Sequence, residues 1–372
     1  MLGEPSDSMK YPLISSFPKD QKLETIPIEI IESATVNLEI KHQDEMAIEE
    51  ALIRAERGEQ VLWIENVVSD SQAIFKILSG RNRAGGLNLE VGLLHSRFQR
   101  KDRAHNENKW VSIFGKAGHS ERKNCGRILI GTQVLEQSLD IDADFLITRI
   151  CPTDMLFQRI GRLWRHRSTD SLRPKEAIRE AWILSPTLED GLNENSWKKT
   201  GKVYSLYVLY RTLEEWLSKK AINLPNDIRR TLEATYLERT EKEILGKWRF
   251  DIEMERNKQI GLANVGLSTG GKTQSEEKAS TRYSESESCE VLLIKGIRAE
   301  NDATVIVLND KEETKLRLPK NIKRESLKTW RSIAATIQEN IVIVPEYLAP
   351  KTKSSQVQWL KDFAYLGDNF DS

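Results

Sequence analysis

One short segment concentrates arginine residues at a spacing that suits phosphate chemistry. Residues 158–167 contain four arginines, and no acidic residue lies within residues 155–169. On a helix over this stretch, Gln158, Arg162 and Arg165 lie four and three residues apart and therefore project from one face. Guanidinium groups at this density suit a triphosphate, and a glutamine can orient an attacking water molecule. The segment predicts a contribution to phosphoryl transfer.

The alternative for this segment is a solvated helix face, which is the usual setting of helical arginines. Gly161 lies inside the stretch, however, and apolar residues surround the arginines. Glycine is unfavourable inside an exposed helix, and the apolar neighbours indicate burial. We therefore favour a functional role for these arginines.

A second segment, residues 131–142, combines a glycine, a hydroxyl and two carboxylates. Gly131 allows a close backbone approach, and Thr132 offers a hydroxyl and an amide at the start of a short helix, where anions bind. Asp140 and Asp142 precede the next expected strand, where a carboxylate can accept hydrogen bonds from a ribose or hold a basic side chain in place. Ordinary capping and turn roles for the two aspartates remain an equal alternative.

A third segment, His95-Ser96-Arg97-Phe98, follows an apolar run and precedes a charged helix. A hydroxyl, a guanidinium and backbone amides at the end of a strand can bind the phosphates of a single strand without reading its sequence. Taken alone, this segment is better explained by a polar loop followed by a solvated charged helix.

The elements that carry these segments alternate between apolar runs and helical patterns. Strands are expected at residues 61–65, 91–95, 127–131, 145–148 and 181–184, and helices at 70–79, 99–110, 133–138 and 155–165. This alternation predicts an α/β fold with a parallel sheet and helices on both faces, in which ligands bind at the carboxyl ends of the strands.

The rest of the chain divides by composition. We expect a linker at 1–25, the sheet domain at 26–190, a helical extension at 191–260, a flexible linker at 261–288, and a small mixed α/β domain at 289–372. Within the helical extension, residues 204–217 form one packed helix face, and residues 224–227 restart a helix. Residues 291–294 and 304–308 predict a hairpin.

Composition excludes some classes of protein. Lysine plus arginine and aspartate plus glutamate each total 56, so any contact with nucleic acid must come from a local patch. The three cysteines are widely spaced, and His42, His105 and His119 lack ligands at metal-binding spacing, so we expect neither disulfides nor a metal site. No stretch approaches the roughly 18 apolar residues of a membrane span, and the N-terminus does not resemble a signal peptide, which predicts a soluble, cytoplasmic protein without a membrane partner.

In their order along the chain, these three segments resemble motifs IV, V and VI of superfamily 2 helicases. Their amino-acid sequences are most similar to those of the CRISPR-associated helicase–nuclease of type I systems. In that family the sixth motif ends in Gly-Arg-Leu-x-Arg-His, as in residues 161–166. Residues 224–229, 281–283 and 291–293 also resemble the C-terminal region of that family. The likeness therefore covers nearly the whole chain and implies a second RecA-like lobe followed by a C-terminal domain.

The resemblance implies roles for individual residues. Arg162 and Arg165 would reach the γ-phosphate of ATP, Gln158 would lie beside the attacked phosphorus, and Asp140 would face the nucleotide. We assign two more residues to the nucleotide site, Gly131 and Arg159. The residues that would contact single-stranded DNA are Asn66, His95, Ser96, Arg97, Thr132 and Gln133.

The same resemblance implies that the motor is incomplete. The family has a nuclease domain and a first RecA-like lobe, which carries the Walker A lysine and makes most of the contacts with ATP and Mg²⁺. Residues 1–60 are too few to contain such a lobe. We expect a split gene product, a truncation, or a fragment that works with a partner chain supplying these domains, with single-stranded DNA and a CRISPR RNA-guided effector complex as further partners. The alternative is a non-catalytic module that binds nucleic acid or the effector complex.

Residues 266–273, Gly-Leu-Ser-Thr-Gly-Gly-Lys-Thr, match the P-loop pattern. A working P-loop follows a buried strand, whereas here a charged helix precedes the match, so we interpret it as a coincidence. Replacing Lys272 with alanine should therefore leave nucleotide affinity unchanged in a binding titration. A large loss of affinity would show that this P-loop is functional.

Overall fold

A computed structural model of the chain describes residues 13–16, 24–28, 32–123, 125–137, 139–268, 288–309, 313–319 and 327–345. Contacts divide the chain into two units: residues 1–95 and 107–284 form the main unit, and residues 96–106 and 285–372 form the second unit. The five segments expected from the sequence remain predictions, because this division is coarser. Within the described residues, no helix is long and apolar enough to span a membrane.

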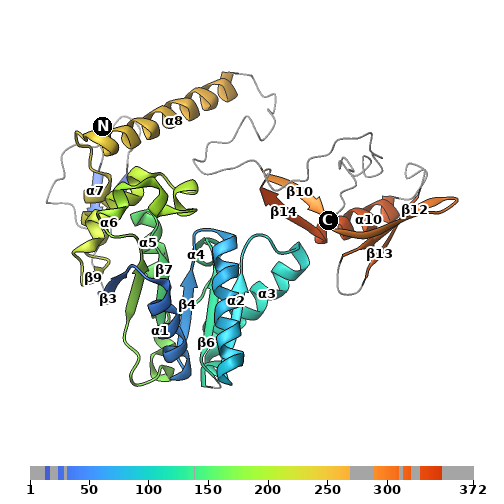
Figure 1. The fold of residues 1–372 in the computed structure, drawn as a ribbon, viewed down its shortest axis with the longest axis horizontal. Coiled ribbons are helices and arrows are strands. Elements are labelled where there is room, and N and C mark those ends of the chain that lie inside the picture. Colours follow the sequence, from blue (N-terminus) through green and yellow to red (C-terminus); the bar gives the residue numbers. More distant parts are fainter. Residues whose placement is uncertain are drawn as a thin grey trace. The chain divides into compact units, whose positions relative to one another are not determined.

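The main unit is built on a seven-stranded sheet (Figure 1). Its strands, in sheet order, are β5 (Glu90–Leu94), β6 (Arg127–Gly131), β4 (Gln60–Ile64), β7 (Phe145–Arg149), β8 (Glu180–Leu184), β3 (Ala34–Lys41) and β9 (Ala221–Leu224). Neighbouring strands are parallel except for β3 with β9. All five expected strands are present, and the predicted parallel α/β fold is confirmed.

Apolar runs alone miss β3 and β9. In β3, the buried residues Val36 and Leu38 alternate with exposed polar residues, so the strand lacks a continuous apolar run. Such alternation is typical of a strand with one buried face. β9 has a single fully buried residue, Ile222, and closes the sheet as an antiparallel edge.

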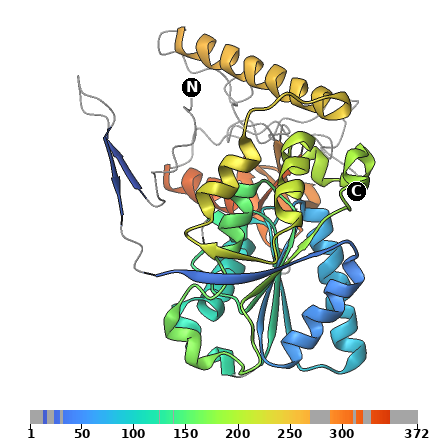
Figure 2. The ribbon, with the colours of Figure 1, turned by 90° about the vertical axis from the view of Figure 1, so that its left-hand side faces the viewer.

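Helices cover both faces of the sheet (Figure 2). One core contains α1 (Asp44–Glu56) and α2 (Val68–Gly85), and the opposite core contains residues of α3 (Arg100–Phe114), α4 (Val134–Gln137), α5 (Thr153–Ile160) and α6 (Leu206–Leu217). Alternate residues of β4 supply the two cores, because successive side chains of a strand point to opposite faces. Short 3₁₀ turns are η1 (Lys116–His119), η2 (Glu121–Lys123), η3 (Arg167–Leu172), η4 (Asp190–Leu192), η5 (Glu194–Trp197) and η6 (Thr200–Lys202).

Helix α5 ends earlier than the sequence pattern predicts. The expected helix over 155–165 stops at Ile160, and Trp164 has a positive φ of 49°. Beyond the helix, fully buried Leu163 forms a parallel bridge with Ala143, which draws the chain beside the start of β7. The expectation that Gln158, Arg162 and Arg165 project from one helix face is therefore wrong.

Both expected linkers contain regular structure where the chain is described. Within 1–25, β1 (Leu13–Ser16) pairs antiparallel with β2 (Glu24–Pro27). Helix α7 (Ile228–Tyr236) starts after residues 224–227 as expected, and α8 (Glu243–Ser268) continues into the segment 261–288. Residues 269–287 of that segment, with Lys272 of the P-loop match, lie outside the described residues.

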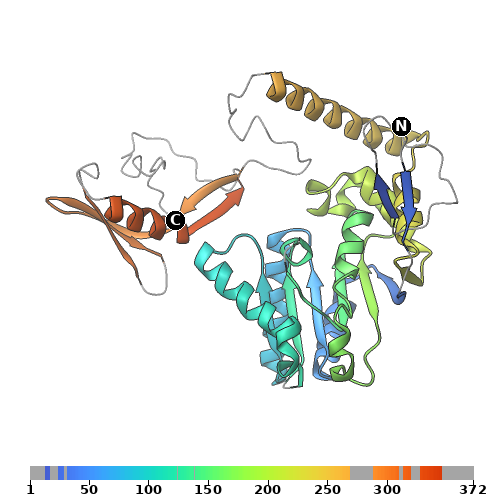
Figure 3. The ribbon, with the colours of Figure 1, turned by 180° about the vertical axis from the view of Figure 1, so that it is seen from behind.

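The second unit contains two small antiparallel sheets and a helix (Figure 3). Strands β11 (Ile294–Ala299), β12 (Ala303–Leu308) and β13 (Lys315–Pro319) form one sheet, β10 (Ser288–Leu292) and β14 (Ile341–Pro345) form the other, and α10 (Leu327–Glu339) packs into their core. The hairpin differs from the expected one, because Leu293 divides its first segment, residues 291–294, between β10 and β11. β11 pairs with β12, whereas β10 pairs with β14.

A buried cluster of charged residues fixes the loop before β7. Asp142 accepts hydrogen bonds from Arg122 and Arg173, both at 2.9 Å, and from the Thr169 hydroxyl. Asp144 also bonds Arg122, at 2.8 Å, and Arg173. The charges of two carboxylates and two guanidinium groups thus neutralise one another in the protein interior, where unpaired charges would be destabilising.

Glu59 is a buried carboxyl with a less complete environment. It is fully buried, neither carboxylate oxygen has a hydrogen-bond partner, and Nη1 of Arg54 lies 3.5 Å from Oε2. Burial raises the pKa of Glu59 to about 7, although Arg54 opposes the shift. Between its ordinary pKa of 4.5 and this value, the folded chain binds the proton that the unfolded chain releases, so rising pH destabilises the fold.

Replacing Glu59 with glutamine should remove this pH dependence. The free energy of unfolding of the variant, relative to the unchanged protein, should rise by up to about 3 kcal/mol as the pH increases through this window. Denaturant titrations at several pH values measure the difference. The exposed-site variant Glu56→Gln is the matched control, and a difference for Glu59→Gln that stays flat with pH would contradict the prediction.

Candidate functional site

Arg159 lies at the centre of the carboxyl edge of the sheet and is fully buried. Its Nε donates to Glu136 at 2.7 Å, and its Nη1 donates to the Thr148 hydroxyl at 2.8 Å and the Arg149 carbonyl at 2.9 Å. Its Nη2 donates to Asn66 Oδ1 at 2.9 Å and also pairs with Glu136. All five guanidinium donors therefore have protein acceptors. Direct contact of Arg159 with a nucleotide would require some of these bonds to break.

Arg162 is also directed into the protein. Its Nη1 donates to the Leu139 carbonyl at 2.7 Å, and its Nη2 donates to the Glu136 carbonyl. Its Nε is buried without a hydrogen-bond partner. Burial and then the charge of Arg165 lower the pKa of Arg162. Arg162 thus binds carbonyl groups at the end of α4 and just beyond it, and its Nε is left without a partner.

Arg165 differs from both, because its side chain is 43% exposed. Its Nε donates to Asp140 Oδ1 at 2.8 Å, and its backbone amide donates to Asp142 Oδ1 at 2.8 Å. His166 Nε2 lies 2.9 Å from the same Asp140 oxygen. Burial alone would raise the pKa of Asp140, but hydrogen bonds from His166 and Arg165 lower it below the ordinary value. The two aspartates hold this arginine in place, as one sequence interpretation proposed.

An open hollow of about 530 Å³ surrounds Arg165. Its lining residues are Lys116, Asp140, Arg165, His166, Arg167 and Ser168. Cationic side chains and a hydroxyl around an open hollow can bind phosphate oxygens. The sequence analysis missed Lys116, which lies in a glycine-rich turn without a recognisable motif. Gln158 is exposed on α5 and does not line this hollow.

Gly131 is required by the packing of β5 and β6. A Cβ atom at this position would lie 2.4 Å from the Leu94 carbonyl oxygen and 2.6 Å from a Leu135 methyl group. The amide of Thr132 donates to the same carbonyl at 3.3 Å, and Thr132 is buried. The close approach predicted for Gly131 is therefore made by a neighbouring strand of the protein.

The amide side chains expected at the DNA are bound within the protein. Asn66 is 2% exposed, and its Nδ2 donates to the Ile150 carbonyl at 2.8 Å and the Thr200 hydroxyl at 3.2 Å. Gln133 is half-buried, and its Nε2 donates to the Asn66 carbonyl at 2.8 Å and the Tyr204 hydroxyl at 3.0 Å. The sequence analysis missed Thr200 and Tyr204 as partners of these residues.

The segment 95–98 is divided between the two units. His95 belongs to the main unit, is 2% exposed, and lies with Nε2 3.2 Å from Gln72 Nε2. Ser96 and Arg97 belong to the second unit, in which Ser96 is exposed and Arg97 is half-buried. Burial leaves His95 little surface for DNA, while Ser96 and Arg97 remain predicted DNA contacts.

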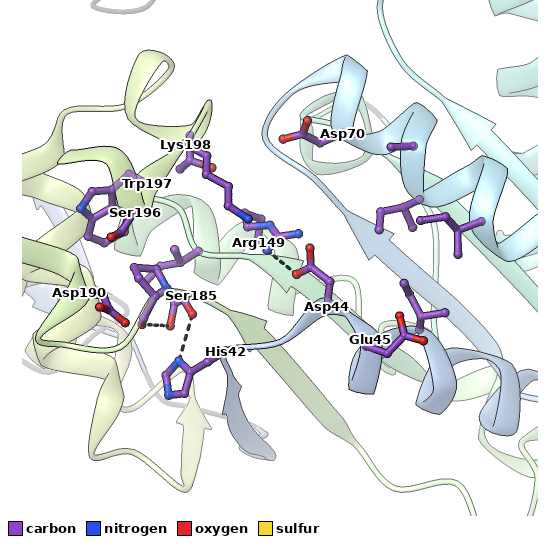
Figure 4. Close-up of a pocket in the computed structure, with 17 residues that line it drawn as sticks. His42, Asp44, Glu45, Asp70, Arg149, Ser185, Asp190, Ser196, Trp197 and Lys198 are labelled. Atoms are coloured by element: carbon purple, nitrogen blue, oxygen red, sulfur yellow. Dashed lines mark hydrogen bonds and ion pairs between the residues drawn. The ribbon is translucent and has the colours of Figure 1, made fainter. Parts of the chain in front are cut away.

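A larger hollow, of about 720 Å³, lies at the carboxyl ends of β3, β7 and β8 (Figure 4). Arg149 points toward Asp44 across this hollow and donates to it at 2.8 Å. His42 Nδ1 lies 3.0 Å from the carbonyl oxygen of Ser185. The residues predicted from the sequence do not line this hollow, and pairing within the protein neutralises much of its charge.

Two methionine substitutions should separate the structural arginine from the exposed one. Arg159→Met leaves Glu136 as an unpaired buried charge and should lower the free energy of unfolding by about 3–5 kcal/mol. Arg165→Met removes an exposed pair and should cost at most about 1 kcal/mol. Denaturant unfolding measures both, and equal losses would contradict these assignments.

Comparisons with known proteins agree with the fold and the motifs. Residues 57–168 match the family model described as CRISPR-associated nuclease/helicase Cas3, C-terminal. The CRISPR-associated endonuclease/helicase Cas3 of Escherichia coli (strain K12) is 38% identical over 192 residues, which are 51% of this chain and 20% of that relative. The chain therefore spans about one fifth of that relative's length.

Two solved structures share the fold. T. fusca Cas3-AMPPNP has a TM-score of 0.68 and 22% identity, with 87% of this chain and 38% of that chain covered. A CRISPR RNA-guided surveillance complex, pre-nicking, has a TM-score of 0.62 and 21% identity, with 87% and 39% covered. Residues 57–168 thus match the model of a Cas3-like C-terminal domain, and the resemblance to the CRISPR-associated helicase–nuclease family is confirmed.

Proposed function

We propose that this chain forms one wall of the ATP-binding cleft of a single-stranded DNA translocase, with Arg165 as its arginine finger. The observation that carries this proposal is the open basic hollow around Arg165. Among the arginines of the segment, Arg159 and Arg162 are buried against groups of the protein, whereas the Arg165 side chain is 43% exposed beside Lys116 and Arg167, and its Nη1 makes only a long hydrogen bond of 3.5 Å to the Gly161 carbonyl. Such a cluster fits a triphosphate.

We assign a role to four of the residues that line the hollow. Lys116 and Arg167 attract phosphate oxygens, and Asp140 holds Arg165 through Nε, so that its terminal N–H groups can bond to the γ-phosphate. Arg162 fixes the end of α4 and thereby the loop that carries Asp140. When bound, ATP supplies the phosphoryl group transferred to water, and Mg²⁺ neutralises part of the phosphate charge. Gln158 remains our proposal for orienting that water.

We propose that a first RecA-like lobe, supplied from outside residues 1–372, completes the cleft. The hollow presents donors for phosphate oxygens, and its one carboxylate, Asp140, is already bonded to Arg165 and His166. The Walker A lysine and the groups that bind Mg²⁺ then come from the first lobe. T. fusca Cas3-AMPPNP, a relative whose name includes a nucleotide analogue, supports a nucleotide at this wall.

We further propose that the complete motor acts on single-stranded DNA with a CRISPR RNA-guided effector complex. The relative from Escherichia coli is named an endonuclease/helicase, and another relative is a CRISPR RNA-guided surveillance complex. Both names support DNA and an effector complex as partners.

A second candidate function is a non-catalytic module that binds nucleic acid or the effector complex. One observation favours it: Arg162, the other predicted finger, is already bound to the carbonyl groups of Glu136 and Leu139. A single exposed arginine would then serve binding rather than hydrolysis.

ATP hydrolysis in a reconstituted motor distinguishes the two functions. The isolated chain should hydrolyse ATP poorly, because one wall of the cleft is missing, and adding the first lobe with Mg²⁺ and single-stranded DNA should restore activity. Arg165→Ala should then lower kcat by about 1,000-fold. Arg230→Ala, at a side chain that is 74% exposed on α7, is the control and should have no effect.

One result would contradict the missing wall, and another would contradict the motor function. Strong DNA-stimulated hydrolysis by the isolated chain would exclude a missing wall. Binding of DNA by the chain without restored hydrolysis, at saturating first lobe, would favour the non-catalytic module.

A further inference from the structure

We infer that Tyr204 positions Gln133 to recognise unpaired bases, by turning the amide nitrogen of Gln133 inward so that its amide oxygen faces the bound strand. This inference rests on the proposed binding of single-stranded DNA. It assigns a role to a residue of the helical extension, outside the three helicase-like segments.

The orientation of the Gln133 amide follows from its partners. Its Nε2 lies 2.8 Å from the Asn66 carbonyl oxygen, which can only accept, and 3.0 Å from the Tyr204 hydroxyl. The amide nitrogen has two hydrogens, and both are used in these bonds. Oε1 is neither bonded to a described residue nor among the buried unpartnered atoms. Gln133 therefore presents only an acceptor to its surroundings.

The residues that hold this amide are themselves fixed. Tyr204 is 7% exposed and packs in the core, and burial raises its pKa, so it remains a neutral hydroxyl that can accept a hydrogen bond. The Asn66 side chain is bound by Thr200, four residues before Tyr204. The amide of Tyr204 donates to the Thr200 carbonyl at 3.0 Å, so one turn of the chain supplies both hydroxyls.

An exposed acceptor cannot bind a phosphate, which at neutral pH offers only acceptors. It can accept from the N–H groups on the Watson–Crick edges of bases, and every base carries at least one. In a duplex these groups are paired, whereas in a single strand they are free. Gln133 held in this way would favour unpaired strands without reading their sequence.

Thymidine oligonucleotides test this inference, because N3-methylthymidine lacks the only Watson–Crick N–H donor of thymidine. Fluorescence anisotropy with the full chain should show about fivefold weaker binding of the methylated strand, the size expected for one hydrogen bond. Tyr204→Phe keeps the ring but removes one of the two acceptors that hold Nε2, so the amide can turn and the ratio between the two strands should fall towards one. A merely structural role of Tyr204 would leave that ratio unchanged.

Tyr207→Phe is the matched control, since it also removes a hydroxyl that is hydrogen-bonded, here to Glu241 at 3.0 Å. It should keep the fivefold ratio. Equal binding of both strands by the unchanged protein, or a ratio that survives Tyr204→Phe, would overturn the inference while leaving DNA binding intact. Failure of the unchanged protein to bind either strand would overturn the proposed DNA binding as well.

Discussion

The buried ion pair between Arg159 and Glu136 is the interaction on which the site depends. A charged pair inside a protein is tolerated only when its remaining hydrogen-bonding groups are also satisfied, because removing ions from water costs several kcal/mol. Arg159 meets that condition by bonding to the end of β7, to Asn66 after β4, and to α4, whereas Oε2 of Glu136 is buried without a hydrogen-bond partner. The Arg159 side chain thereby connects α4 and the ends of β4 and β7, which carry or adjoin the predicted motifs.

This constraint explains why neighbouring arginines have different environments. Arg159 lies on α5 and points into the carboxyl edge, and Arg162 follows the helix end and binds the carbonyls of α4. The chain then leaves the helical path, because Leu163 is drawn beside Ala143. Arg165 consequently emerges on a different, open surface, where a ligand can reach it.

Five strands of the main sheet could be predicted because each is an apolar run between polar breaks. β3 and β9 could not, since only Val36 and Leu38 of the alternating residues in β3 and only Ile222 in β9 are buried. The early end of α5 was also hidden, because the helical spacing of apolar residues and arginines continues in the sequence beyond Gly161. The bridge between Leu163 and Ala143 takes the chain out of the helix, and no local sequence pattern indicates this bridge.

The candidate site was only partly predictable for a similar reason. The sequence identified arginines that suit phosphate, and Arg165 and Asp140 do meet. It did not reveal that Arg159 and Asn66 bond to each other across 93 residues, or Gln133 and Tyr204 across 71. Such pairs depend on the folded sheet, so residues expected at a ligand proved to be bonded within the protein.

The central claim is that Arg165 is the finger that this chain contributes to the ATP cleft. A structure of the chain with a first RecA-like lobe, ADP, Mg²⁺ and aluminium fluoride tests it most directly, since the fluoride mimics the transferred phosphoryl group. We predict the terminal nitrogens of Arg165 within hydrogen-bond distance of the fluoride. Arg165 bonded only to Asp140, with the fluoride contacted solely by the first lobe, would contradict the claim.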